Sequence, residues 1–366
     1  MINRLLRLAA VAVAANAIAG VAVAAEEKVL NVYNWSDYIA DDTLKRFTDK
    51  TGIKVNYDVY DSNEILEAKL TAKKSGYDVV FPSATPYLQR AIQAGLVRKL
   101  DRAKIPNYAK VDPKALAQIK VADPDNAYAI PYMMAGTGVG YNIEKLKQLL
   151  PDAPIGSLAL LFDPKVLFKI KGCGVTLLDA AEEVFAAALA YSGKNPTSTA
   201  RDDLKLAVDV VTKARLNYRY IHSSAYINDL ANGATCVAMG YAGDLVQARD
   251  RARDAKNKVE IGIFLPKEGA AFNIDVMAIP VDAPHPENAH LFIDFLLTPD
   301  VIGAISNKVG YANAVPEARA HMDKAIFADP VIYPPAGVKL YPIELVPPEF
   351  ERERNREWSK VKAKRK

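Results

Sequence analysis

Cysteine, histidine and tryptophan are scarce in this chain, and charge of either sign is nearly balanced. Of 366 residues, two are cysteine, four are histidine and two are tryptophan. Two cysteines are too few for a disulfide-rich scaffold, and the histidines show no metal-ligand spacing. The 47 basic and 43 acidic residues are too evenly matched for a dedicated nucleic-acid-binding protein. Half of the residues are hydrophobic, which is typical of a globular chain of two domains at this length.

Motifs for catalysis and for nucleotide binding are also lacking. No Gly-x-Ser-x-Gly motif is present, and neither cysteine has the surroundings of a catalytic thiol. The run Gly-Thr-Gly-Val-Gly at residues 136–140 imitates a phosphate-binding loop, but its final spacing is wrong and no convincing strand precedes it. A segment crossing between two lobes is the better interpretation. Nothing in the sequence demands a nucleophile or a cofactor.

The long hydrophobic run of the chain lies at its N-terminus. Two arginines precede a segment rich in Ala, Val, Ile and Gly over residues 8–23, which ends in the small residues of a signal-peptidase site. A membrane anchor is the alternative, but the run is only weakly hydrophobic and two glutamates follow it at once. We predict that residues 1–25 are a signal peptide, cleaved near Ala24 or Ala25, and that the mature chain is exported.

Export changes the meaning of the two cysteines. In an oxidising compartment Cys173 and Cys236 form one disulfide by default, and two buried free thiols are the alternative. Closing a loop of about 64 residues would remove on the order of 4 kcal/mol of unfolded-chain entropy.

Short β-rich runs alternate with helical patterns from residue 26 onward. The first part of the chain predicts strands over 29–33, 53–59 and 77–81, and helices over 41–50, 61–74 and 86–95. A later part predicts a crossing strand over 136–141, buried strands over 236–240 and 276–280, and helices over 182–191, 202–215 and 288–297. This alternation is typical of parallel α/β sheets. Since the late strands must join an existing sheet, we expect two α/β lobes that exchange segments.

Candidate binding residues follow directly after apolar runs, because ligands bind beyond the carboxyl ends of parallel strands. Four places qualify: Trp35-Ser36-Asp37-Tyr38, Pro82-Ser83, Tyr241-Ala242-Gly243-Asp244, and Asp275 beside Val276. They supply carboxylates, hydroxyl groups and aromatic rings, and none of them contains Lys or Arg. Such a site favours a cation.

Simpler roles remain open for several of these residues. Asp37 and Asp244 can be caps of the helices that follow them, and Trp35 can be a ring of the core. Asp275 lies inside an apolar run, where a carboxylate is costly unless it is paired. The acidic pair at 182–183 can simply interact favourably with a helix dipole.

At these residues the chain resembles the periplasmic polyamine-binding proteins of ABC importers, nearest the putrescine-binding branch. The resemblance begins near residue 29 and covers nearly the whole mature chain, with its most specific stretches at 31–39, 51–55, 78–83, 178–185, 222–233, 266–269 and 311–313. It implies an α/β fold of the two-lobed type II periplasmic solute-binding class, with segment exchange between the lobes, a hinge-closing ligand cleft and no catalysis. The expected division is 26–134 plus 266–310 for lobe 1 and 135–265 plus 311–366 for lobe 2. The resemblance also favours the pairing of Cys173 with Cys236.

Carried over position by position, the resemblance implies ligand contacts from both lobes. They are Trp35, Ser36, Asp37, Tyr38, Ser83 and Asp275 in the first lobe, Glu183, Tyr241 and Asp244 in the second, and Tyr311 near the hinge. Glu183 is preferred to Glu182 because the family's carboxylate precedes a Val-Phe pair. A diamine has two ammonium groups on an apolar stem, and so needs carboxylates at both ends and rings along the middle. The expected function of this periplasmic monomer is to capture putrescine or a related diamine by cleft closure and to deliver it to a permease of the inner membrane.

Three positions depart from the family pattern and leave the preferred amine open. Asn273 and Met134 stand where an aromatic ring is usual, and Tyr241 stands where Trp is common. Losing a ring can cost on the order of 1 kcal/mol, enough to reorder putrescine, cadaverine, agmatine and spermidine. A carboxylate-dependent glycosidase and a ferric-ion-binding protein are more distant alternatives. A glycosidase needs one raised and one ionised acid, and ferric sites favour adjacent tyrosines, which are dispersed here.

Overall fold

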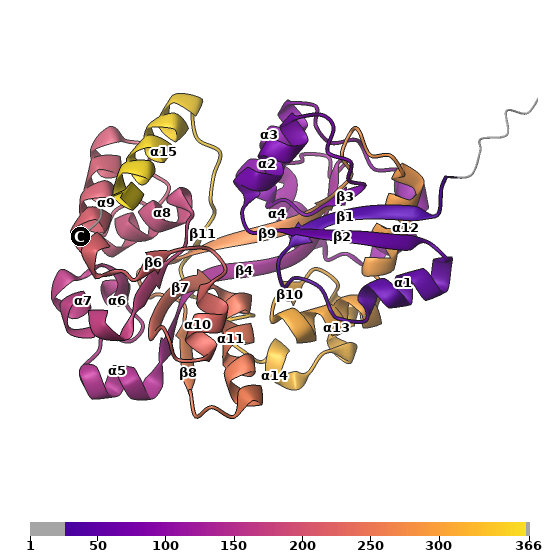
Figure 1. Ribbon diagram of the computed structural model, residues 1–366. Coiled ribbons are helices and arrows are strands. Elements are labelled where there is room, and N and C mark those ends of the chain that lie inside the picture. Colours follow the sequence, from indigo (N-terminus) through magenta and orange to yellow (C-terminus); the bar gives the residue numbers. More distant parts are fainter. Residues whose placement is uncertain (1–25, 364–366) are drawn as a thin grey trace, which may run out of the picture.

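Two α/β lobes joined by long strands make up the computed structural model, which describes residues 26–363 (Figure 1). The predicted signal peptide lies outside the described residues. Segments far apart in the sequence are interleaved in the sheet. The strands lie in the order β2 (Lys54–Tyr60), β1 (Val29–Trp35), β3 (Val79–Val80), β9 (Ala270–Ala278), β4 (Ala129–Asn142), β7 (Val237–Tyr241), β5 (Val175–Leu177) and β6 (Tyr220–Ile221). The expected two-lobed α/β fold with exchanged segments is confirmed.

The first lobe is built on three parallel strands with helices between them. Its elements are β1 (Val29–Trp35), α1 (Thr43–Thr51), β2 (Lys54–Tyr60), α2 (Asn63–Thr71), β3 (Val79–Val80), α3 (Gln89–Gln93) and α4 (Pro113–Gln118). Leu30 and Val32 of β1 are fully buried. Helix α2 begins after Ser62, whose hydroxyl accepts the Ile65 amide, and not after Asp61 as the capping pattern predicted. The side chain of Asp61 is therefore free for another contact.

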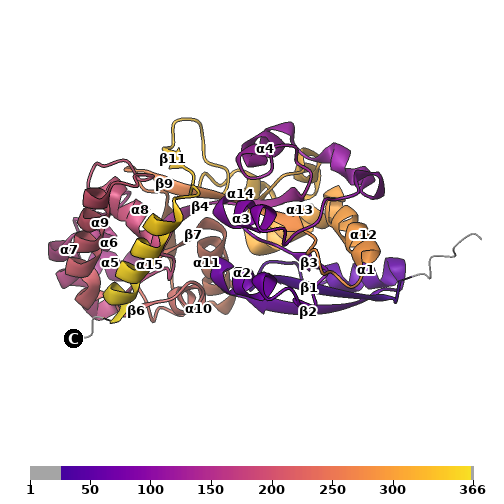
Figure 2. The same cartoon turned by 90° about the horizontal axis from the view of Figure 1, so that it is seen from above.

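Two long antiparallel strands, β4 (Ala129–Asn142) and β9 (Ala270–Ala278), connect the lobes. The first half of β4 pairs with β9, from Ala129 opposite Ala278 to Gly136 opposite Phe272. Its second half pairs with β7 (Val237–Tyr241) and β8 (Ile261–Phe264) of the other lobe. Both strands run between the two halves of the molecule in Figures 1 and 2. The glycine-rich run at 136–140 thus lies in a crossing strand, as expected, and not in a phosphate loop.

The second lobe has its own sheet and a helical shell. Besides β7 and β8 it contains α5 (Ile143–Leu149), α6 (Ala159–Phe162), α7 (Pro164–Ile170), β5 (Val175–Leu177), α8 (Ala181–Tyr191), α9 (Arg201–Ala214), β6 (Tyr220–Ile221), α10 (Tyr226–Ala231) and α11 (Ala242–Ala255). Nine of the eleven residues of α8 are buried, so this helix runs through the core of the lobe. The two sequence-predicted helices at 182–191 and 202–215 correspond to α8 and α9.

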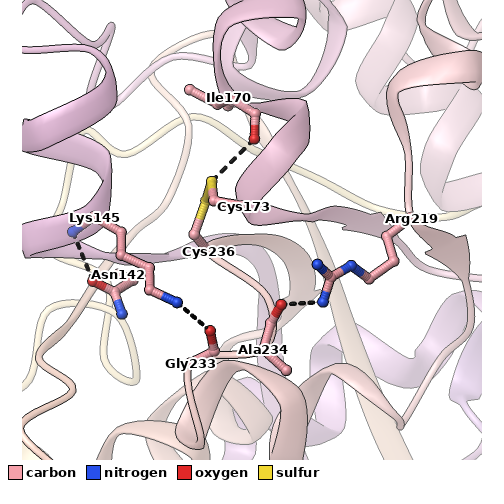
Figure 3. Close-up of a disulfide and its surroundings, with 8 residues drawn as sticks. All are labelled: Asn142, Lys145, Ile170, Cys173, Arg219, Gly233, Ala234 and Cys236. Atoms are coloured by element: carbon pink, nitrogen blue, oxygen red, sulfur yellow. Dashed lines mark hydrogen bonds between the residues drawn. A yellow bond between two sulfur atoms is a disulfide. The ribbon is translucent and has the colours of Figure 1, made fainter.

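The expected disulfide is present in this lobe. Cys173 and Cys236 are bonded, with 5.5 Å between their Cα atoms, and join the turn before β5 to the start of β7. Figure 3 shows two basic side chains that bind the backbone just before Cys236. Lys145 Nζ donates to the Gly233 carbonyl at 2.6 Å, and Arg219 donates to the Ala234 carbonyl. The bridge thus fixes the loop that precedes a cleft-forming strand.

The C-terminal part of the chain is shared by the two lobes. Its elements are α12 (Pro286–Leu296), α13 (Pro299–Val309), β10 (Ala312–Asn313), α14 (Lys324–Phe327), β11 (Leu340–Tyr341) and α15 (Pro348–Ala363). Ala312 pairs with Met134, and Ile326 and Ile332 belong to the first lobe's core, whereas Trp358 of α15 belongs to the second lobe's core. We therefore propose that residues 311–332 form part of lobe 1, whereas Tyr341 of β11 and helix α15 pack against lobe 2.

None of the helices within residues 26–363 combines the length and the apolar character that a membrane span requires. The bent pair α12 and α13 passes that test on length and composition only.

Candidate functional site

A cavity of about 770 Å³ that opens to solvent lies between the lobes. Nine of the ten sequence-predicted site residues line it: Trp35, Ser36, Tyr38, Ser83, Glu183, Tyr241, Asp244, Asp275 and Tyr311. The crossing strands explain this convergence, because β9 brings Asp275 back beside the strands of the first lobe, while α8 and α11 line the opposite wall.

Asp275 is held by two hydroxyl groups of the first lobe. Tyr38 Oη and Ser83 Oγ each donate to its carboxylate at 2.7 Å, and Ser83 and Asp275 form an isolated antiparallel bridge. Burial raises the pKa of Asp275 to about 6, although both hydrogen bonds act to lower it. The carboxylate is therefore oriented by neutral donors, and no cation of the protein balances it among these contacts.

Asp244 has the same arrangement on the other wall. It lies in the first turn of α11, and Tyr226 Oη and Tyr311 Oη each donate to it at 2.7 Å. Burial raises its pKa to about 6, again against the two hydrogen bonds. Gly243 permits this contact, because a Cβ there would lie 1.9 Å from the Tyr311 ring. The helix-cap alternative for Asp244 is not supported, since no side chain caps α11.

Glu183, on the buried face of α8, accepts bonds from a hydroxyl and an amide. Thr137 Oγ1 donates to one carboxylate oxygen at 2.6 Å and Asn273 Nδ2 donates to the other at 2.5 Å. Burial raises the pKa of Glu183 to about 7, and the charges of Glu182 and Asp275 add to the rise. The carboxamide of Asn273, one of the three expected departures from the family pattern, thus hydrogen-bonds directly to Glu183, which we expect to contact the ligand.

Aromatic rings form the sides of the cavity. Trp35 Nε1 donates to the Phe81 carbonyl at 2.8 Å, and its ring lies 4.7 Å from that of Tyr60. Tyr38 and Tyr311 meet edge to face with centroids 4.8 Å apart. Trp35 is thus anchored by packing and also lines the cavity, and its contact with a ligand stays a prediction.

Asp37 is the predicted residue that the structure does not bring to the cavity. Its carboxylate forms an ion pair with Arg251 of α11 at 2.8 Å, and its backbone is left-handed with φ of 54°. Gln247 of the same helix donates to the Asp37 carbonyl at 3.3 Å. A guanidinium from the opposite lobe pairs with this carboxylate, so in this structure Asp37 links the lobes and does not line the cavity.

Sequence reasoning missed several lining residues. These include Tyr60, Asp61, Asn63, Tyr87, Glu182, Ser223, Ser224, Ile227 and Ile343. Asp61 directly follows β2, so the rule that selected residues after strands would have found it, had it not been assigned to a helix cap. Its carboxylate accepts a bond from Ser36 Oγ at 2.9 Å. Tyr87 reaches the other lobe, since its hydroxyl donates to Glu182 at 3.1 Å.

The cavity is strongly acidic. Its lining carries the carboxylates of Asp61, Glu182, Glu183, Asp244 and Asp275, and within residues 26–363 no Lys, Arg or His lines it. Burial favours protonation of Glu182, Glu183, Asp244 and Asp275, and a bound cation would reverse that preference. Such an arrangement can hold an organic cation with more than one charged group.

Comparison with known proteins agrees with this geometry. The sequence is 50% identical over 345 residues to the putrescine-binding periplasmic protein PotF of Escherichia coli, covering 93% of each chain. It is 47% identical over 352 residues to the putrescine-binding periplasmic protein SpuD of Pseudomonas aeruginosa, covering 95% of this chain and 96% of the relative.

Solved structures show the same fold. The TpPotD lipoprotein of Treponema pallidum superimposes with a TM-score of 0.76 at 26% identity, covering 92% of this chain and all of the other. Residues 42–334 also match the family described as bacterial extracellular solute-binding protein. With that match and the two long alignments, the chain belongs to the bacterial extracellular solute-binding proteins, among relatives named for binding putrescine in the periplasm.

Proposed function

We propose that this protein is the periplasmic solute-binding component of an ABC importer, and that it captures a diamine, putrescine or a close relative, in the cleft between its lobes. The names of its relatives point to this ligand class, and the acidic cavity supports it independently. Delivery to an inner-membrane permease, export by the N-terminal signal and the absence of catalysis are parts of the same proposal.

The observation that carries the proposal is that each wall of the cleft has a carboxylate oriented by two hydroxyl groups. Asp275 of β9 and Asp244 of α11 each accept two hydroxyl bonds, so each presents a fixed negative charge without a neighbouring protein cation in those contacts. An alkyl diammonium ion has a cation at each end and an apolar stem between. Its stem can lie against the rings of Trp35 and Tyr38, which favour cations and methylene groups next to them.

Neither lobe alone completes this cavity. In the ligand-free protein the acids of the two walls repel one another, which favours an open cleft. A dication between them is attracted to both walls and binds the closed form better, so it shifts the population toward closure. The closed molecule then presents surfaces of both lobes together to the permease.

Isothermal titration calorimetry with 1,3-diaminopropane, putrescine, cadaverine, agmatine and spermidine tests the proposal. The expected result is one-to-one binding of at least one diamine, with n-butylamine, which has a single charge, bound at least about tenfold more weakly because one wall is left unbalanced. Equal affinity for n-butylamine and putrescine, or no binding of any polyamine, would contradict it. Mass spectrometry of ligand released from freshly purified protein identifies the natural occupant.

A further inference from the structure

A second pocket lies behind the wall of the cleft, inside lobe 2. It opens to solvent, encloses about 480 Å³ when the solvent at its mouth is counted, and lies between α8, α9, the segment 342–346 and α15. Its walls are largely apolar, with Phe185 and Leu189 from α8, Leu204 from α9, and Val346 and Phe350 from the C-terminal segment. Glu182 and Ile343 line both this pocket and the cleft cavity, so they form the partition between the two.

A buried guanidinium without a close partner faces this pocket. Arg354 of α15 is only 7% exposed, and its buried Nε has no hydrogen-bond partner. Within residues 26–363 its sole ion-pair contact is with Glu351 at 3.8 Å, which is too long for a hydrogen bond. Leaving a buried donor such as Nε without an acceptor is costly, although the charge of Arg354 is felt by the buried Glu182, whose pKa burial raises and this charge acts to lower. An acceptor in the pocket would satisfy this donor.

The acids around Arg354 are engaged or solvated. Glu351 accepts a bond from Arg90 of the other lobe at 2.5 Å, and Glu182 accepts a bond from Tyr87 at 3.1 Å. Glu344 also lines the pocket but is exposed at its rim. None of the three hydrogen-bonds to the guanidinium, so Arg354 remains available as the donor that orients an incoming group.

We propose that this pocket is a second ligand site, which binds a small carboxylate with an apolar body. The carboxylate would accept bonds from the Arg354 guanidinium, for which planar, forked donors are well suited. The hydrocarbon part would lie among Phe185, Leu189 and Phe350. This site is separate from the acidic cleft and takes the opposite charge, so it does not depend on the proposed diamine function.

Calorimetry with 4-methylpentanoate tests the proposal, with the cleft kept saturated by the best-bound diamine. The expected result is saturable binding of 4-methylpentanoate, and at least tenfold weaker binding of the uncharged 4-methylpentanamide, because the amide has lost the charge-assisted bonds to Arg354. Undetectable binding of the carboxylate, or equal binding of the amide, would overturn the proposal.

Variants locate the site on the molecule. Arg354→Gln should weaken carboxylate binding at least tenfold, whereas Arg356→Gln should leave it unchanged, because Arg356 lies on the same helix but outside the pocket. Val346→Phe should also weaken it by filling the pocket, and it leaves the guanidinium in place if Arg354→Gln does not fold. Unchanged affinity in Val346→Phe together with either unchanged affinity or misfolding in Arg354→Gln would overturn the assignment.

Discussion

At the scale of single residues, the cleft contains buried acids whose ionised form is disfavoured by burial. Asp244, Asp275 and Glu183 each accept two hydrogen bonds from neutral groups, yet burial still raises the pKa of each. An acid whose pKa is higher in the folded than in the unfolded protein destabilises the fold as pH rises from the unfolded pKa to the folded one. Ligand binding relieves this cost, which links the free energy of folding to function.

Substituting Asp275 by Asn separates the effect of this acid on ligand affinity from its effect on the stability of the ligand-free protein. Diamine affinity should fall by roughly 2 kcal/mol, about thirtyfold, because one ammonium group loses its charged partner. In the absence of ligand, the melting temperature of the variant minus that of the wild type should be larger at pH 7.5 than at pH 4.5. The reason is that the wild-type acid is already neutral in the folded protein at pH 4.5, so its removal gains less there. Calorimetry and differential scanning calorimetry measure the two quantities.

The matched control is Asp49→Asn, which removes a carboxylate from an exposed i,i+4 pair with Lys45. It should leave diamine affinity unchanged. If Asp275→Asn binds diamines as well as the control does, Asp275 does not contact the ligand charge.

Binding of a diamine should release protons near neutral pH. The pKa values of about 6 for Asp244 and Asp275 and about 7 for Glu183 mean that part of this set is protonated at pH 6.5. A dication favours the ionised forms, so their pKa values fall on binding and protons leave. Affinity should therefore rise between pH 5.5 and pH 8 and then level off.

Calorimetric titrations at pH 6.5 in phosphate and in imidazole, whose ionisation enthalpies differ, measure the released protons. Release should be clear at pH 6.5 and near zero at pH 8.5. An enthalpy independent of the buffer at pH 6.5 would show that the acids remain ionised in the empty cleft.

At the scale of elements, the crossing strand β4 needs its glycines for packing. Gly140 lies opposite Ala238 of β7, and a Cβ on it would lie 2.7 Å from Leu245 of α11 and 2.8 Å from Leu230 of α10. Both leucines are fully buried, so they have little room to move. The run that imitates a phosphate loop is thus a surface against which two helices pack closely.

Gly140→Ala should lower the free energy of unfolding by about 1–3 kcal/mol through overpacking. Gly172→Ala is the control, because a Cβ there meets nothing within 4 Å. Denaturant unfolding followed by tryptophan fluorescence compares the two variants. Equal stability would mean that α10 and α11 adjust without cost, and that the close approach to β4 is not required.

At the scale of the whole molecule, contacts between the lobes accompany the cleft. Arg251 of α11 pairs with Asp37, and Glu351 of α15 pairs with Arg90, each contact joining one lobe to the other. The Asp37 pair is partly exposed, and such pairs contribute about 1 kcal/mol or less. The Asp37 pair is too weak to hold the cleft closed by itself, and we expect the ligand to decide the balance between the open and closed forms.

Small-angle X-ray scattering should therefore show a smaller radius of gyration after saturation with the best-bound diamine. The combined variant Asp244→Asn with Asp275→Asn should show less compaction at the same ligand concentration, because its walls attract the dication less. A scattering profile that does not change on saturation of the wild-type protein would show that closure is not part of binding.

The sequence alone was sufficient for the class of fold and for nine of the twenty-one residues that line the cavity. Alternating strand and helix patterns predicted two α/β lobes, and polar residues placed after apolar runs included Ser83, Asp244 and Asp275. These signals are local, because a few neighbouring residues determine where a strand ends and where a helix begins. Asn273 was identified only as a departure from a family pattern, and Tyr226 and Glu182 were not selected, since a hydroxyl or a second acid on a helix has no distinctive local spacing.

Partners across the lobes were decided by the tertiary structure alone. Whether Asp37 faces a ligand or Arg251 depends on how α11 docks beside the first lobe, which no local pattern encodes. The packing of Ile326 and Ile332 in the first lobe's core, and the burial of Arg354 beside α8 and α9, follow from packing between segments far apart in the chain. Local sequence determines what each segment can present, whereas burial and long-range packing determine which charges meet, and so what the cavity attracts.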